Sequence, residues 1–440
     1  MIDEEFNDVV REAWEAGDME GTTIHTARLK LANCQMGLKC WSGNKFGNAE
    51  RELKRKSKQL VILQTTSSTD NADTIKQLQE EINFILEQLD IRWKQRAKQN
   101  WYQYGDQNTP FFHAWATHRR RVNQIRVIKY MEGREWKKPE EIGLAFCNFY
   151  QKLFSAGETR RITESLQYVE PRMTVEMNAM LLRTYTTEEV ELALSQMHPL
   201  KSPGPDGFAA CFYQKSWATV KTEVCVAVLD FLNNGNFDNE LNVTHIALIP
   251  KKKNPSALTD YRPISLCNVL YKLIAKVITN RLKKVLAIII SPSQSAFVPG
   301  RLITDKVLVT FKALHTMDIK LKGRDAYMAL KLDMSKAYDR VEWNYLEAVM
   351  RKLGFDDRWV QLAMMCVRTV SFSVLINGQP HGHINPSRGI RQGDPLSPYF
   401  FILCAEGLSS LLNQAEVDRS ITGIPIPKGG TRINHLFFCR

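Results

Sequence analysis

From Tyr185 onward, the chain alternates helix signals with short extended runs and rigid Pro/Gly turns, and this alternation constrains the fold most strongly. The first helix signal is Thr186-Thr-Glu-Glu189, a capping box in which the Thr hydroxyl and the Glu carboxylate bind free amides at a helix start. Asn377-Gly378 is typical of a hairpin turn. Helices mixed with short strands predict an α+β fold. The expected helices are residues 186–197, 269–287, 335–353 and 399–412, and the expected strands are 243–250, 327–333 and 372–376.

Positive charge is concentrated upstream of this region. The chain of 440 residues has a formal net charge of +12, and residues 92–138 hold twelve Lys or Arg against three Asp or Glu, a net of +9. Cations interleaved with aromatic rings suit nucleic acid, because cations neutralise phosphates and rings stack on unpaired bases. The alternative is a solvated charged face whose aromatic rings turn to the core. The candidate nucleic-acid-binding residues are Lys94, Arg96, Lys98, Trp101, Arg119, Arg120 and Arg121.

Composition excludes several other classes of protein. Apolar residues make up 44% and charged residues 24%, which is ordinary globular usage. The longest purely apolar run, residues 285–290, is too short to span a bilayer, and the acidic N-terminus is no signal peptide. Nine cysteines without a C-x-x-C pair indicate reduced thiols and no zinc module. We therefore expect an intracellular protein that does not contact membranes.

One helix upstream of the basic zone has a regular apolar stripe. Its apolar residues recur at alternating steps of three and four, which is the spacing of one helix face. The stripe either packs on its own domain or forms a coiled-coil seam between chains, in which case the chain is an interaction protein. Its members are Ile75, Leu78, Ile82, Ile85 and Leu89.

A carboxylate at the end of the predicted strand 327–333 is the first candidate for chemistry. Asp333 would lie on the floor of a cleft, where two-metal phosphoryl transfer needs acidic ligands. Tyr338, five residues on, would wall the site beside a sugar. A strand, an Asp and a helix also follow one another in many α/β folds without any catalytic role.

Two further segments suit nucleotide binding. Residues 387–398 form a Gly/Pro-braced turn before an apolar helix, which lets backbone amides and Gln392 approach a base or sugar closely. Lys251 and Arg262 are cations beside a predicted strand end, where they could grip a triphosphate. An ordinary capped loop and a solvated lysine cluster are the corresponding alternatives.

Taken together and in order, these segments resemble the reverse transcriptase of non-LTR (LINE-type) retrotransposons, most closely those of plant genomes. The resemblance spans residues 90–440. The segments that carry it are Lys201-Ser-Pro-Gly-Pro-Asp-Gly207, Leu248-Ile-Pro-Lys251, Tyr261-Arg-Pro-Ile-Ser-Leu266, Gln294-Ser-Ala-Phe-Val-Pro-Gly-Arg301, Leu332-Asp-Met-Ser-Lys-Ala-Tyr-Asp339 and Gly389-Ile-Arg-Gln-Gly-Asp-Pro-Leu-Ser-Pro398.

The resemblance implies a right-hand polymerase that adds dNTPs to a DNA primer on an RNA template. Residues 185–324 would form the fingers and 325–440 the palm, preceded by a helical basic region (1–138) and a helical connector (139–184). Asp333 would be the first ligand of Mg²⁺ or Mn²⁺, and Tyr338 would sense the sugar 2′ position. Lys251 and Arg262 would lie near the triphosphate, and Gln392 and Gly393 would line the nucleotide pocket. Action on chromosomal DNA would imply the nucleus.

The sequence departs from the family at the palm hairpin, where Phe/Tyr-Ala-Asp-Asp supplies the second metal-binding Asp. Here residues 433–438 resemble the strand that leads into the hairpin, but Cys439 and Arg440 follow. Asp339 and Asp394 belong to other motifs and do not substitute. We therefore expect a truncated palm without a thumb, an exposed apolar edge at residues 434–438, and little or no polymerase activity. The alternative function is a non-catalytic RNA- or DNA-binding remnant; no oligomeric state is indicated.

Overall fold

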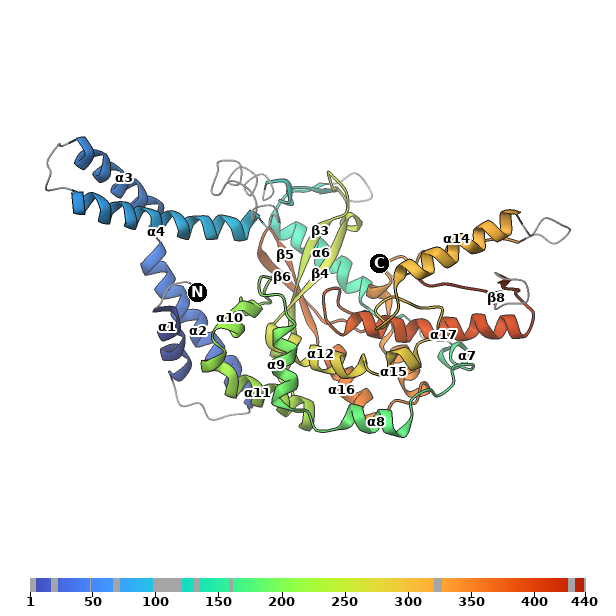
Figure 1. The fold of residues 1–440 in the computed structure, drawn as a ribbon. Coiled ribbons are helices and arrows are strands. Elements are labelled where there is room, and N and C mark those ends of the chain that lie inside the picture. Colours follow the sequence, from blue (N-terminus) through green and yellow to red (C-terminus); the bar gives the residue numbers. More distant parts are fainter. Residues whose placement is uncertain are drawn as a thin grey trace. The chain divides into compact units, whose positions relative to one another are not determined.

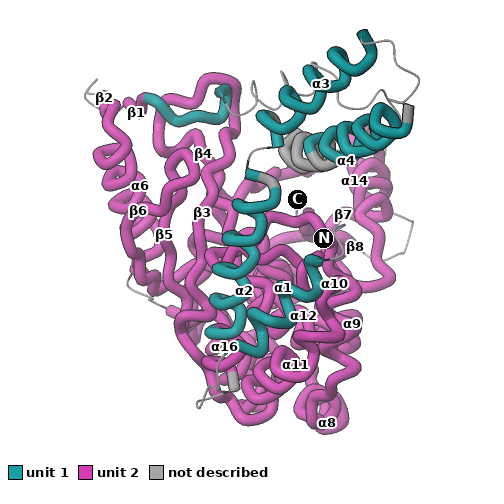
Figure 2. Tube along the Cα trace, turned by 90° about the vertical axis from the view of Figure 1, so that its left-hand side faces the viewer, with its two compact units in different colours: residues 1–19, 29–126 teal, residues 20–28, 127–440 magenta. Residues whose placement is uncertain are grey.

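The computed structural model describes residues 5–16, 23–47, 49–65, 72–97, 121–129, 135–157, 161–319, 327–425 and 432–438. The chain divides into two compact units (Figure 2). The first comprises residues 1–19 and 29–126, and the second comprises residues 20–28 and 127–440. Each unit is described by itself.

The described part of the first unit is mostly helical. It contains α1 (Glu5–Glu15), most of α2 (Thr23–Phe46), α3 (Ala49–Thr65) and α4 (Ala72–Ala97). One face of α1 is buried, including Val10 and Trp14. Trp41 of α2 donates a hydrogen bond to Glu5 (3.1 Å) and its ring lies 6.3 Å from that of Phe6. These contacts join α1 to α2.

The apolar stripe lies on α4, which confirms the predicted helix. Helices α3 and α4 form a hairpin (Figure 1), and Leu78, Ile82 and Leu89 are at most 9% exposed. Lys56 of α3 and Glu81 of α4 form an ion pair of 2.6 Å across it. Three of the five stripe residues are therefore buried within the chain, which favours the interpretation that the stripe packs on its own domain.

The core of the second unit includes a four-stranded sheet of order β4-β3-β5-β6 (Figure 1). Its strands are β3 (Val243–Pro250), β4 (Tyr261–Cys267), β5 (Ser371–Ile376) and β6 (Gln379–Ile384). Strands β3 and β5 are parallel, whereas the other two pairs are antiparallel. Asn377 and Gly378 have positive φ angles (52° and 92°), as a tight hairpin turn requires, so this prediction is confirmed. Helix α6 (Pro139–Leu153) packs on β5 and β6.

Most of the second unit is helical, and α12 (Val269–Leu282) lies at its centre with most of its residues buried. The capping box of Thr186 and Glu189 is present at the start of α9 (Thr187–Ser195). The predicted helix 269–287 ends five residues early, before the short α13 (Leu286–Ile289). The other helices are α7 (Ile162–Ser165), α8 (Val175–Leu182), α10 (Ala210–Lys215), α11 (Trp217–Asn234), α14 (Ile303–Ile319), α15 (Trp343–Lys352), α16 (Asp357–Arg368) and α17 (Ser397–Val417), with 3₁₀ turns η3 (Asn239–Asn242), η4 (Leu258–Asp260) and η5 (Tyr338–Arg340).

Two short antiparallel strand pairs are also described: β1 (Ile128–Lys129) pairs with β2 (Glu135–Trp136), and β7 (Ile424–Pro425) pairs with β8 (Arg432–Ile433). The eight described cysteines are free thiols. Within the described ranges, no helix is long and apolar enough to cross a bilayer.

The predicted buried strand 327–333 is wrong. These residues form no strand, and Met328, Leu330 and Leu332 are 82%, 70% and 76% exposed. A strand exists through hydrogen bonds to a neighbour, and no described strand pairs with this segment. The predicted helix 335–353 is also shortened. Lys336 has a left-handed φ of 54°, η5 follows, and α15 begins only at Trp343.

The expected unpaired edge at residues 434–438 is only partly observed. Phe437 forms a parallel bridge with Gln294, and its amide donates to the Ser293 carbonyl (3.1 Å). His435 binds the Ser409 hydroxyl of α17 (2.9 Å). Phe438 is 51% exposed. Contacts with residues 293–294 and with α17 thus hold part of this segment.

Candidate nucleotide-binding site

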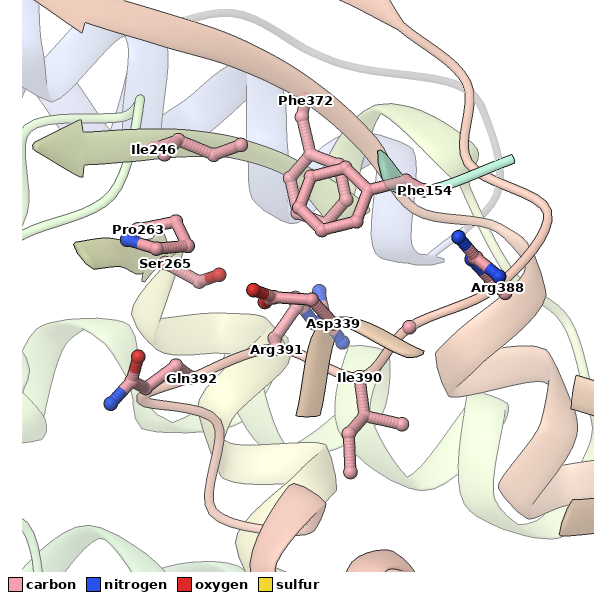
Figure 3. A pocket seen from close by; sticks show the side chains of 11 residues that line it. Phe154, Ile246, Pro263, Ser265, Asp339, Phe372, Arg388, Ile390, Arg391 and Gln392 are labelled. Atoms are coloured by element: carbon pink, nitrogen blue, oxygen red, sulfur yellow. The ribbon is translucent and has the colours of Figure 1, made fainter. Parts of the chain in front are cut away.

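A small hollow lies between the sheet and the loop that precedes α17 (Figure 3). Strands β3, β4 and β5 contribute one wall, and the backbone of residues 388–392 contributes the other. The carboxylate of Asp339 points into the hollow on the side of the Ser265 hydroxyl, below the rings of Phe154 and Phe372. The lining residues are Phe154, Ile246, Pro263, Ser265, Asp339, Phe372, Arg388, Gly389, Ile390, Arg391 and Gln392.

A buried arginine holds the loop in place. Arg391 is 5% exposed, forms an ion pair with Asp394 (2.8 Å), and donates to the Cys366 carbonyl (3.0 Å). It also donates to the side chain of Asn242, and its guanidinium lies 3.9 Å from the centre of the Tyr271 ring. Buried charges persist only when they are paired and hydrogen-bonded. This arrangement meets both conditions and ties the loop to η3, α12 and α16.

Asp394 completes the same arrangement. Its carboxylate accepts a hydrogen bond from the Tyr271 hydroxyl (2.7 Å) and one from the Leu396 amide (2.9 Å). Together with the Arg391 ion pair, these contacts occupy the carboxylate at the entrance to α17. The sequence assigns Asp394 to a motif other than the metal-binding one, and in the structure its carboxylate is bound by Arg391, Tyr271 and the Leu396 amide.

Close backbone approach explains two glycines of the loop. Gly393 has a φ of 113°, and a Cβ there would lie 3.1 Å from the Ser265 carbonyl oxygen. Gly389 has a φ of 91°, and its Cβ would lie 2.9 Å from the Asp339 carbonyl oxygen. Any side chain would strain these positions. The Ser265 amide donates to the Gln392 carbonyl (2.8 Å), so the loop is attached to β4 directly.

The same loop also binds the segment around η5. The Ile390 amide donates to the Tyr338 carbonyl (2.9 Å), and the Trp343 indole donates to the Gly389 carbonyl (2.7 Å). The Tyr338 ring stacks on Phe401 of α17, with the ring centres 5.2 Å apart and the planes at 12°. Tyr338 and Gln392 therefore lie on adjoining segments with fixed backbones.

Asp339 is the unusual group of the hollow. It is 8% exposed, and within the described residues its carboxylate makes no hydrogen bond. Burial raises its pKa to about 6, although Lys336 and then Lys251 act in the opposite direction. Burial also raises the pKa of the Tyr150 phenol, and the charge of Asp339 adds to that effect. The hollow thus contains a carboxylate that is costly to ionise.

Comparisons with known proteins identify the fold that carries this site. Residues 249–436 match the family described as reverse transcriptase (RNA-dependent DNA polymerase). Over 329 residues, 74% of the chain, it is 30% identical to the transposon TX1 uncharacterized 149 kDa protein of Xenopus laevis. Over 253 residues, 56% of the chain, it is 27% identical to the retrovirus-related Pol polyprotein from type-2 retrotransposable element R2DM of Drosophila melanogaster. The chain carries a LINE-type reverse transcriptase domain.

The matches cover only 24% of the Xenopus protein and 23% of the Drosophila protein, so the chain spans about a quarter of these relatives. A shorter and closer match is to an uncharacterized mitochondrial protein of Arabidopsis thaliana. It is 55% identical over 64 residues, which are 14% of the chain and 52% of that protein.

Within the reverse transcriptase domain, the structure brings several predicted site residues together. Tyr338, Gln392 and Gly393 lie on the hydrogen-bonded segments around the hollow. Lys251 is exposed at the end of β3, where its ammonium donates to the Thr259 carbonyl (3.0 Å) and lowers the pKa of Asp339. Arg262 is exposed on β4, in register with Ile249 of β3. Both cations therefore lie near the same end of the β3–β4 pair.

Asp333 is placed differently. It is exposed on the unpaired segment before η5. The family uses divalent metal ions, but within the described ranges no group of three or more His, Cys, Asp or Glu could hold a metal ion. Asp394 is occupied by Arg391, and Asp339 faces the hollow. The described residues therefore do not fit a two-ion centre.

The predicted nucleic-acid-binding residues fall mostly outside the described structure. Arg121 is exposed in a short helical turn. Lys94 and Arg96 lie on α4, but their side chains are outside the described residues. Lys98, Trp101, Arg119 and Arg120 lie outside the described residues altogether.

Sequence reasoning missed the residues that hold the site. The buried network of Arg391, Asn242 and Tyr271 was not predicted, and Asp339 was assigned only to a motif. One local signal was available, because Arg391 and Asp394 stand three apart in a loop braced by Gly and Pro. Two of their partners, Asn242 and Tyr271, lie more than a hundred residues away in the chain, which no local pattern reveals.

Proposed function

We propose that residues 249–436 act as an RNA-directed DNA polymerase domain of a LINE-type retroelement, which adds dNTPs to the 3′-hydroxyl of a DNA primer on an RNA template. The observation that carries this proposal is the junction of Tyr338, Gln392 and Gly393 around one hollow, within the stretch that matches the family. A nucleotide site needs segments whose backbones are fixed before substrate arrives, since preorganisation reduces the cost of binding. The Arg391 network supports such a site.

In this proposal the domain is a right hand, with fingers at residues 185–324 and palm at 325–440. The helical basic region 1–138 and the connector 139–184 precede it. Lys251 and Arg262 neutralise the triphosphate, and Tyr338 senses the sugar 2′ position. Gln392 contacts the nucleotide, which Gly393 allows because it brings the loop against β4.

Asp333 is the proposed first ligand for Mg²⁺ or Mn²⁺. The resemblance expects the family's Ala and first Asp where Cys439 and Arg440 stand, so we propose no second carboxylate ligand at these two positions. Because the described residues contain no group that fits a two-ion centre, we expect little or no nucleotide incorporation by the 440-residue polypeptide.

The exposure of Asp333 favours a second candidate function, a non-catalytic nucleic-acid-binding remnant. The two candidates share the RNA template and DNA primer as partners and differ in chemistry. In the remnant, the basic residues still bind phosphates with a steep salt dependence, while Asp333 has no role.

One experiment separates the candidates. The purified 440-residue chain is mixed with a labelled DNA primer annealed to an RNA template, with dNTPs and either Mg²⁺ or Mn²⁺. Binding is followed by fluorescence anisotropy and extension by gel electrophoresis. We expect salt-dependent binding of the primer–template without extension, which supports the remnant for this polypeptide.

Asp333→Asn provides the matched control, because the change is isosteric and the side chain is exposed. If the chain extends the primer and Asp333→Asn abolishes extension without weakening binding, the polymerase candidate is correct and our expectation of inactivity is wrong. If neither binding nor extension is seen, both candidates are overturned.

A further inference from the structure

Helix α3 of the first unit has two unlike faces. Leu53, Lys56 and Leu60 turn toward α4 and are partly buried, whereas the opposite side is exposed. Four exposed positions on that side follow the i, i+3, i+4, i+7 pattern of one helix stripe, and all four are basic. We name this stripe the α3 basic face, and its members are Arg51, Lys54, Arg55 and Lys58.

Most of the charge on the α3 basic face is not neutralised by the chain. Arg55 forms an ion pair with Glu52 (2.7 Å). Within the described residues, Arg51, Lys54 and Lys58 form no ion pair. Lys56, on the inner side, is paired with Glu81 and its side chain is only 19% exposed. Three free cations therefore lie along two helical turns, a length of about 10.5 Å at 1.5 Å per residue.

The rest of the hairpin shows that this charge is one-sided. On α4 the exposed residues Asp73, Glu80 and Glu87 repeat every seven residues and are acidic. A polyanion is therefore attracted to the α3 basic side of the hairpin and repelled by Asp73, Glu80 and Glu87 of α4. Beyond the basic residues, Val61 and Ile62 are 59% and 62% exposed and offer apolar contact to unpaired bases.

We propose that the α3 basic face binds the phosphate backbone of a nucleic acid. The spacing of its cations, about 5–6 Å between neighbours on a helix face, suits a strand that carries one charge per nucleotide. The complementary alternative is a second copy of the chain, whose acidic α4 residues would meet α3. The net charge of +12 on each copy opposes that association and favours a polyanion.

This interface is separate from the proposed polymerase function. It lies outside residues 249–436 and outside the basic zone 92–138. It needs neither Asp333 nor nucleotide incorporation, so measurements of binding alone test it.

The test is the salt dependence of binding by the full 440-residue chain. Anisotropy of a labelled 30-nucleotide RNA and of a DNA duplex is measured from 50 to 300 mM salt. The variant is R51Q/K54Q/K58Q, because glutamine removes charge while keeping good helix propensity. We expect the log–log slope to fall by about 2 for single-stranded RNA and by about 3 for the duplex, since each lost contact removes roughly 0.7 or 0.9. Affinity at 0.1 M salt should fall at least ~10-fold for the preferred nucleic acid.

The matched control is K152Q/K352Q/R358Q, which also removes three positive charges, but from exposed positions of the second unit. It should change affinity less than about twofold, because long-range charge is screened beyond ~10 Å at 0.1 M salt. Thermal melting confirms that both variants fold.

Two outcomes overturn the proposal. One is equal binding by R51Q/K54Q/K58Q and the parent chain, or an equal loss in the control. The other is a change in molar mass by light scattering without any change in nucleic-acid affinity, which would assign the α3 basic face to self-association.

Discussion

The loop Gly389–Pro395 and the segment Tyr327–Met334 carry the two halves of the proposed site, and the structure supports them very differently. The loop is tied to the fold by the buried Arg391–Asp394 pair and by backbone hydrogen bonds to β4 and η5. The segment has no strand partner among the described residues, and its apolar side chains face solvent. The half formed by the loop is therefore held in place by the chain's own contacts, whereas the half with Asp333 is not.

Two segments of one proposed site can therefore both be recognised in the sequence, although the fold holds one of them in place and not the other. Both segments lie within residues 249–436, which match the reverse transcriptase family. Burial of apolar surface stabilises a fold by about 25 cal/mol per Å². Of the two segments, only the loop is buried enough for this effect to fix its backbone. An exposed segment depends on pairing with another strand before its carboxylate can be held in one position.

The largest expected effect comes from removing the arginine that holds the loop. Arg391→Ala leaves Asp394 as a buried charge without its cation, and breaking one partner of a buried pair costs about 3–5 kcal/mol. Urea denaturation followed by circular dichroism should show this loss in the free energy of unfolding.

Arg262→Ala is the matched control, because Arg262 is exposed on β4. It should change the free energy of unfolding by less than about 0.5 kcal/mol. A loss of less than about 1 kcal/mol in Arg391→Ala would mean that the loop is held by other contacts and that the comparison is wrong.

The sequence predicted the parts of the fold that depend on local chemistry. The capping box of α9, the hairpin turn at Asn377-Gly378 and the amphipathic α4 are all observed, because each is determined within a few residues. The strand at 327–333 failed for the opposite reason. Its apolar pattern describes a surface that would be buried against a partner, and a pattern does not say whether the partner is present.

The candidate site shows the same limit. Motif order placed Tyr338, Gln392 and Gly393 in one site, and the structure brings their segments together. The residues that hold them, among them Asn242 and Tyr271, could not be found from sequence, since their contacts join distant segments.

The buried carboxylate of Asp339, beside the loop, should have an intermediate effect on the free energy of unfolding. Asp339 has a pKa of about 6 in the folded protein against 3.8 when unperturbed, because burial disfavours its charge. Between these values the folded protein binds more protons than the unfolded chain, so the free energy of unfolding falls as pH rises from about 4 to 6. At 1.36 kcal/mol per unit, the full loss is at most about 3 kcal/mol.

Asp339→Asn should remove this loss and raise the free energy of unfolding at pH 7 by about 1–3 kcal/mol. Urea titrations between pH 4 and 7 measure it. Burial also raises the pKa of Asp206 to about 6, so Asp206→Asn should remove a separate share of the same slope and the double variant should flatten it further. An unchanged slope in Asp339→Asn would show that the carboxylate is solvated and that the loop side of the comparison is less tightly packed than its contacts indicate.

The smallest expected effect lies in the exposed segment. Leu330→Asp should change the free energy of unfolding by less than about 0.5 kcal/mol, because an exposed side chain loses no buried surface. The same change should reduce the light scattering from aggregates that form when the protein is concentrated, because an unpaired apolar segment promotes aggregation. The control is Val374→Asp on β5, where the side chain is 0% exposed. It should lower the free energy of unfolding by several kcal/mol, because it buries an unpaired charge. If Leu330→Asp instead destabilised the protein by more than about 2 kcal/mol, Leu330 would be packed in solution. Asp333 would then lie on a supported segment, and the contrast between the two halves of the site would disappear.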